Sequence, residues 1–148
     1  MTDTLAYHLI WTTYGTWLPG DDRGWTDGTG RSREPEDALW TAARTAMTDD
    51  PAALAPDQRA VVTDTIRRHC AVRGWPLHAL HVGAVHVHVV VTAGKPPEVA
   101  LAEFKTWCTR RLNDGFGRRA WWTEGGCKRR VESERYFDWV VRYVSECQ

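Results

Sequence analysis

The sequence has no hydrophobic run long enough to cross a bilayer, no charged-then-apolar leader and no C-x-x-C pair. The first two absences argue against a membrane partner and against export, so we expect a cytoplasmic protein. The four cysteines are widely separated, which argues against a zinc ribbon or a disulfide framework and is typical of a reducing cytosol. Repeats and low-complexity tracts are also lacking, and the 148 residues predict a single domain, residues 1–148.

A net charge is lacking as well, because 19 basic residues balance 19 acidic ones. The two signs are nevertheless separated along the chain. Acidic residues dominate between positions 21 and 57, and basic residues between positions 105 and 130. Such a separation can make one face attractive to nucleic acid although the total cancels. It is equally typical of two solvated surfaces that pair with each other or with a second subunit.

Strand and helix patterns alternate along the chain, after an unusually long loop at residues 14–35 that is rich in Gly, Asp, Thr and Pro. The mixture of strands with long helices, including two neighbouring strands, predicts an α+β fold. We expect a ferredoxin-like (split βαβ) antiparallel sheet covered by helices. The predicted elements are strands at 5–13, 76–83 and 85–93, helices at 36–48, 57–73 (ended by Gly74) and from 94–97 to about 113, a β-hairpin of 120–124 and 127–131 around Gly125-Gly126, and a last helix at 134–147 capped by Ser133.

The sharpest motif is the strand segment VHVHVVV at residues 85–91. Side chains alternate along a strand, so His86 and His88 project to one side about 6–7 Å apart, while the valines point into a core. Two imidazoles on one face of a central strand can converge on a divalent cation. The same pair is also compatible with half-exposed histidines that bind nothing. His81, on the preceding strand, is a candidate third or supporting group.

The last predicted helix carries Tyr136 and Tyr143, seven residues apart and therefore on one helix face. One interpretation is a core stripe of tyrosine and valine. The functional interpretation places one tyrosine over a metal ion, with its hydroxyl as nucleophile. Glu146, one turn further on, or the terminal Gln148 then offers an additional oxygen ligand.

These groups suit the chemistry of a phosphodiester, whose negative charge repels nucleophiles. A divalent cation neutralises that charge, and a positioned phenol can then attack in line and form a phosphotyrosine. The covalent bond keeps the phosphodiester energy, so a 3′-hydroxyl can reverse the step without ATP. Several oxygen ligands beside histidine suit Mg²⁺ or Mn²⁺ as much as zinc, and we expect Mg²⁺ or Mn²⁺ as the cofactor.

Several segments resemble the HUH single-tyrosine transposases, which include the REP-associated tyrosine transposases and their insertion-sequence relatives. HVHVVV at residues 86–91 is similar to the family's histidine–hydrophobe–histidine strand. The remaining similar segments are HLIWTTYGTWLPGDDRGW at 8–25, FKTWCTRRL at 104–112 (the following helix), WWTEGGCKRRV at 121–131 (the hairpin) and VVRYVSECQ at 140–148 (the tyrosine helix).

The resemblance implies that His86 and His88 bind the metal and that Tyr143 is the nucleophile, forming a 5′-phosphotyrosine and freeing a 3′-hydroxyl. It also implies a single-stranded DNA partner with hairpins and a homodimer in which the tyrosine helix can serve the partner's histidines. The family often carries glutamine four residues after the tyrosine, where this chain has Cys147. The third metal ligand is therefore left between Gln148 and Glu146. Tyr136 is the rival nucleophile, and Tyr14 a more distant one.

DNA contacts are predicted from the basic segment and from the nine tryptophans. Arginine and lysine near phosphates position DNA without reading its sequence. Trp121 and Trp122 are adjacent, so in a strand one of them faces outward, where it can stack on a base or pack against a helix or a second subunit. The predicted DNA-binding residues are Lys105, Arg110, Arg118, Arg119, Trp121, Lys128, Arg129 and Arg130.

The sequence thus predicts a metal-dependent single-stranded DNA endonuclease and strand transferase, a transposase in function. Three alternatives remain open. A non-catalytic nucleic-acid-binding module on the same sheet would explain the bases and tryptophans. A metallohydrolase would use the histidines to activate water, without a covalent intermediate. A domesticated transposase would keep the fold and bind DNA for its host.

Overall fold

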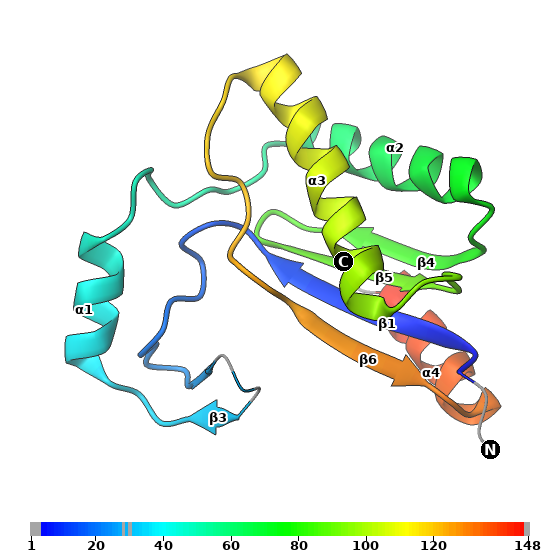
Figure 1. The fold of residues 1–148 in the computed structure, drawn as a ribbon, viewed down its shortest axis with the longest axis horizontal. Coiled ribbons are helices and arrows are strands. Elements are labelled where there is room, and N and C mark those ends of the chain that lie inside the picture. Colours follow the sequence, from blue (N-terminus) through cyan, green and yellow to red (C-terminus); the bar gives the residue numbers. More distant parts are fainter. Residues whose placement is uncertain (1–3, 28, 30, 147–148) are drawn as a thin grey trace.

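A four-stranded antiparallel sheet forms the centre of the computed structural model, which describes residues 4–27, 29 and 31–146 (Figure 1). Its strands lie in the order β4-β5-β1-β6, so β5 and β1 are central. The bounds are Ala6–Thr12 for β1, Leu77–Val82 for β4, His86–Val91 for β5 and Cys127–Val131 for β6. The α+β class and the antiparallel sheet predicted from the sequence are confirmed, with the His-x-His segment on a central strand.

Helices cover both faces of the sheet because each face carries a cluster of buried apolar side chains. Helices α2 (Pro56–Arg73) and α3 (Pro97–Phe116) lie on one face, and α4 (Glu134–Ser145) lies on the other (Figure 1). Leu9, Val89 and Phe104 are fully buried in the larger core under α2 and α3. The smaller core under α4 contains Val90 and Val140, also fully buried.

Helix α4 begins and packs as its sequence predicts. The Ser133 hydroxyl accepts a hydrogen bond of 3.1 Å from the backbone N–H of Tyr136, which caps the helix. Val140 and Val144, four residues apart, are fully buried against the sheet. Tyr136 and Tyr143 are therefore placed on a neighbouring part of the helix surface. The predicted end of this helix, at residue 147, lies outside the described residues.

The predicted hairpin around Gly125-Gly126 is wrong. Strand β6 pairs with β1, with Ile10 opposite Cys127, and the preceding segment also follows β1, with Thr13 opposite Trp122. From Ile10 to Thr13 the first strand advances by three residues while the other segment advances by five, so the stretch from Trp122 to Cys127 holds two extra residues and forms a bulge. A Cβ on Gly126 would lie only 2.8 Å from the carbonyl oxygen of Ile10. Gly126 thus allows a close backbone approach, and Gly125 adopts a positive φ of 79°, without a chain reversal.

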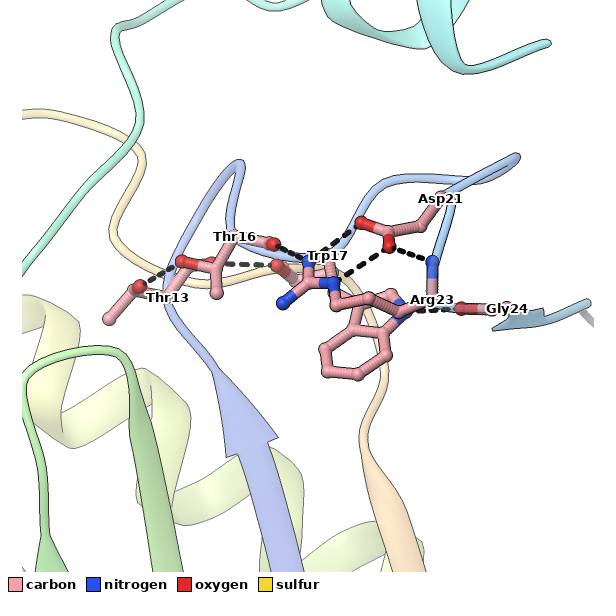
Figure 2. A network of polar contacts seen from close by, with 7 residues as sticks. Thr13, Thr16, Trp17, Asp21, Arg23 and Gly24 are labelled. Carbon is pink, nitrogen blue, oxygen red and sulfur yellow. Dashed lines mark hydrogen bonds and ion pairs between the residues drawn. The ribbon is translucent and has the colours of Figure 1, made fainter. Parts of the chain in front are cut away.

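The segment predicted as one long loop contains ordered structure at one side of the sheet (Figure 1). It includes the short paired strands β2 (Trp25–Thr26) and β3 (Ser32–Arg33), and is followed by α1 (Asp37–Thr45). Figure 2 shows the polar network that fixes its first part. The Arg23 guanidinium donates to both carboxylate oxygens of Asp21 (2.8 and 2.7 Å) and to the Thr16 carbonyl (2.7 Å), and it lies over the Trp17 ring. These hydrogen bonds hold the pKa of Asp21 at about 2.

Membrane spans were predicted to be absent. In the described part of the chain, every helix is too short or too polar to cross a bilayer.

Candidate functional site

Histidines from three strands gather on the face of the sheet that α4 covers. His86 and His88 lie on β5, with ring centres 5.0 Å apart. His81 on β4 lies opposite His88 in the strand register, with its ring centre 5.9 Å from that of His86 and 6.2 Å from that of His88. His8 on the neighbouring β1 stacks against His88 at 5.4 Å. The alternation of side chains along each strand produces this cluster.

His8 and His88 form a buried hydrogen-bonded pair. His8 Nε2 lies 3.1 Å from His88 Nδ1, and the two residues are only 3% and 6% exposed. Burial lowers the pKa of each imidazole to about 4; nearby histidines add to the effect at His88, and Arg129 adds to it at His8. Both rings are therefore neutral at pH 7, which is the form that binds metal ions.

The hydrogen bond also decides which nitrogen of His88 is available. When His88 donates its Nδ1–H to His8 Nε2, its own Nε2 carries a free lone pair that can bind a metal ion. A metal-binding histidine usually donates its other ring N–H to a partner in this way. In that tautomer His8 is the supporting acceptor, whereas the sequence offers His81 as a third or supporting group.

The donor set of this cluster fits a divalent cation held by two histidines, His86 and His88. Among residues 4–146, except positions 28 and 30, no group of three histidine, cysteine, aspartate or glutamate side chains is arranged to hold a metal ion. Glu146, the residue that caps the end of α4, is exposed and does not complete such a group. The other predicted third ligand, Gln148, lies outside the described residues. Two histidine ligands leave positions for water, phosphate oxygen and a further ligand.

Tyr143 stands beside the histidines, whereas Tyr136 does not. The Tyr143 ring lies edge-on to His88, with ring centres 6.1 Å apart, and it is 46% exposed. Tyr136 lies two helical turns earlier, near Arg129, whose pKa it helps to raise. Trp139 lies between them and stacks on both rings. Of the two predicted nucleophiles, Tyr143 is the one placed to act on a group bound at the histidines.

The predicted DNA-binding residues do not form a single surface. Lys105, Arg110, Arg119 and Trp121 line a hollow of about 600 Å³ between α3 and the segment before β6. On β6, Arg129 lies opposite His8 and faces the histidines. Its neighbours Lys128 and Arg130 point to the opposite face of the sheet, which α3 covers, and the Arg130 guanidinium lies over the Tyr7 ring. Arg118 is exposed.

Internal bonds occupy several of these side chains. The Lys105 ammonium donates to the carbonyls of Thr123 and Gly125, at 2.8 Å each, and burial lowers its pKa. Arg119 donates to the carbonyls of Asp50 and Ala120. Both side chains fasten loops of the chain.

The sequence predicts that one of Trp121 and Trp122 faces outward, and it is not Trp121. Its side chain is only 4% exposed, and its indole N–H donates to Asn113 at 2.8 Å. Trp122 packs edge-on against Trp11 and is also partly buried. The segment is anchored to α3 and β1 at this point, so neither indole is presented to solvent as a strand would present one of them.

Two residues of the site were not predicted. His8 has a signal in the sequence, because it alternates with the apolar Tyr7, Leu9 and Trp11 and must face the other side of β1. Trp139 has a weaker signal, three residues after Tyr136 and four before Tyr143, which is the spacing of helical neighbours.

No family model matches the chain, and no curated protein matches it in sequence. Its structure is similar to two solved structures along 97% of its length. One is a protein described as a transposase from Deinococcus radiodurans, with a TM-score of 0.55, 18% identity and 91% of that chain covered. The other is a REP-associated tyrosine transposase bound to a REP hairpin, with a TM-score of 0.56, 12% identity and 67% of that chain covered. This chain has the fold of the tyrosine transposases that its motifs resemble.

Proposed function

We propose that this protein is a transposase-like, metal-dependent endonuclease and strand transferase for single-stranded DNA, with Tyr143 as nucleophile. The observation that carries the proposal is the position of the Tyr143 ring, 6.1 Å from that of His88, above a pair of histidines on a central strand. The transposase fold supports the reaction class. The neutral state of His88 supports its role as a ligand.

In the proposed reaction, the Tyr143 hydroxyl oxygen attacks the phosphorus of a DNA phosphodiester and loses its proton. The bond between phosphorus and the 3′-oxygen breaks, and the leaving oxygen takes up a proton to become a 3′-hydroxyl. The 5′-phosphate remains on the tyrosine until a 3′-hydroxyl attacks it and restores the phosphodiester. Mg²⁺ or Mn²⁺ bound at His86 and His88 would neutralise the charge on the phosphate oxygens.

The chain's own groups contribute three further things. His8 orients His88 through their 3.1 Å hydrogen bond. Arg129 brings a positive charge to the same face of the sheet, where it can contact a DNA phosphate. Val140 and Val144 fix α4 on the sheet, which keeps Tyr143 near the histidines.

The proposed substrate is a single strand that contains a hairpin. It is supported by the structural neighbour that is bound to a REP hairpin. A homodimer and a cytoplasmic location complete the proposal. The dimer rests on the motifs that resemble the transposases, and the location rests on the widely separated cysteines.

The test uses a labelled library of single-stranded oligonucleotides rich in hairpins, incubated with the protein in Mn²⁺ or in EDTA. Denaturing gels are expected to show a metal-dependent protein–DNA adduct that Tyr143→Phe and His88→Ala abolish and Tyr136→Phe retains. Cleavage without an adduct would identify a hydrolase that activates water. Binding without cleavage would identify a DNA-binding module or a domesticated transposase. Either result would overturn the proposal.

A further inference from the structure

Helix α4 carries a row of stacked aromatic rings beside the histidines, partly exposed to solvent. Trp139 stacks on Tyr143 at 5.1 Å with an interplanar angle of 11°, and on Tyr136 at 6.0 Å with an angle of 27°. Trp139 is 57% exposed, more than any other tryptophan of the chain. The rings are stacked with an offset, which leaves much of the indole uncovered. A large aromatic surface held open in this way is typical of a binding site.

The core does not need Trp139, because α4 is held on the sheet by Val140 and Val144. Two other exposed tryptophans are partly covered by a cation, since Arg23 lies over Trp17 and Arg110 over Trp107. Among the described residues no cation lies over the face of Trp139, whose stacking partners are Tyr136 and Tyr143. Packing within the chain therefore does not explain why Trp139 is exposed.

Two arginines flank the exposed indole. Arg135 lies one turn before Trp139 and Arg142 one turn after it, so the three side chains share one helix face. Both arginines are exposed, and neither forms an ion pair with a described carboxylate. A cation, an aromatic ring and a second cation in a row suit an unpaired base between two phosphates. We call Arg135, Trp139, Arg142 and Tyr143 the α4 stripe.

We propose that the α4 stripe binds the single strand next to the reacting phosphate, with a base stacked on Trp139 and phosphates at Arg135 and Arg142. The inference rests on the proposed function, because Tyr143 is at once the end of the stripe and the nucleophile. Tyr143 follows Trp139 by four positions in the helix, which corresponds to a rise of about 6 Å. A nucleotide adjacent to the phosphate under attack can therefore reach the indole.

The test measures affinity by fluorescence anisotropy in the Tyr143→Phe background with EDTA, so that covalent capture does not contribute. The probes are labelled oligo(dT) and an oligomer of equal length made of abasic nucleotides. Trp139→Ala is expected to weaken binding of oligo(dT) about 5- to 100-fold and to leave binding of the abasic oligomer unchanged. Trp139→Phe is expected to retain most of the affinity.

The arginines should act differently, because they contact phosphates. Arg135→Gln and Arg142→Gln are expected to weaken both probes and each to reduce the slope of log K against log[salt] by about 0.7. Trp40→Ala is the matched control, since Trp40 is 39% exposed on α1, in the acidic part of the chain. It should leave both affinities unchanged, and circular dichroism should show that all variants fold.

An equal loss on both probes for Trp139→Ala, or a similar loss for Trp40→Ala, would overturn the inference. The inference would also fail if light scattering showed that Trp139→Ala converts a dimer to a monomer while the affinity for oligo(dT) stays unchanged. The α4 stripe would then contact a second copy of the chain. If the adduct forms and the Trp139 effect is absent, this inference alone fails. If the Trp139 effect is present without any adduct, the proposed reaction fails and the stripe remains a base-binding surface.

Discussion

Replacing His8 by phenylalanine tests whether this buried histidine prepares His88 for a metal ion. Phenylalanine fills a similar volume on β1, where His8 is 3% exposed, but it has no ring nitrogen. The 3.1 Å hydrogen bond to His88 Nδ1 is then lost. We expect a 10- to 100-fold weaker affinity for Mn²⁺, about the loss that follows removal of a supporting partner of a metal ligand.

The magnitude follows from the burial of His88. At 6% exposure, its Nδ1–H has little access to water once the acceptor is gone, and an unpaired buried donor costs about 1–3 kcal/mol. In the metal-free protein His88 can carry its proton on Nε2 instead and avoid this cost. The penalty therefore falls on the tautomer that binds the ion, and about 1–3 kcal/mol corresponds to about 5- to 100-fold in affinity.

Isothermal titration calorimetry with Mn²⁺ measures the affinity directly, and NMR of the imidazole nitrogens reports the tautomer of His88. His8→Gln is the matched variant, because its amide oxygen can accept from His88 Nδ1 and should restore much of the affinity. Thermal unfolding followed by circular dichroism separates a local effect from a loss of fold. An unchanged Mn²⁺ affinity in His8→Phe would refute the reasoning, as would a metal affinity that does not depend on His88.

Three further outcomes follow from the packing and from the shifted pKa values. Because α4 is packed against its own β4 and β5, Tyr143→Phe and His88→Ala chains should stay inactive when mixed; regained adduct formation would show assembly between subunits. Asp21→Asn should speed hydrogen exchange of residues 14–24 at pH 7. The pKa of Asp21 is lowered from 3.8 to about 2. Ionised Asp21 therefore contributes up to about 2 kcal/mol of stability above pH 4, and this stability is lost as the pH falls through 2. Only the wild type should lose stability in this pH range, because the asparagine variant has no carboxyl group to protonate. Peptide mapping after thiol labelling at pH 8 should find Cys127 modified and Cys108 protected, because burial raises the pKa of the Cys108 thiol to about 12; equal labelling would contradict the core packing.

The parts of the fold that the sequence predicts correctly depend on local patterns. The alternation in HVHVVV places both histidines on one face of β5, whatever the strand pairs with. Ser133 and the spacing of Val140 and Val144 likewise determine where α4 starts and which side it buries. Each of these patterns involves only residues close in sequence.

The wrong predictions concern features that depend on pairing between segments far apart in the sequence. A Gly-Gly pair between two short predicted strands is the usual signal of a hairpin, and nothing near it in the sequence distinguishes a hairpin from a bulge. The distinction comes from β1, whose edge pairs with both segments, and from Lys105, whose ammonium donates to the carbonyls of Thr123 and Gly125. Long-range contacts also bury Trp121, whose indole N–H donates to Asn113 on α3, whereas adjacency predicts only that one of Trp121 and Trp122 faces outward.

The candidate site combines both kinds of information. His86, His88 and Tyr143 could be selected from local motifs, but the hydrogen bond between His88 and His8 depends on the register of β1 with β5, in which Ile10 lies opposite His88. A register shifted by one residue would turn His8 into the other core and leave His88 without its partner. The position of His8 therefore links the strand pairing, which the sequence does not reveal, to the protonation state that a metal ligand needs.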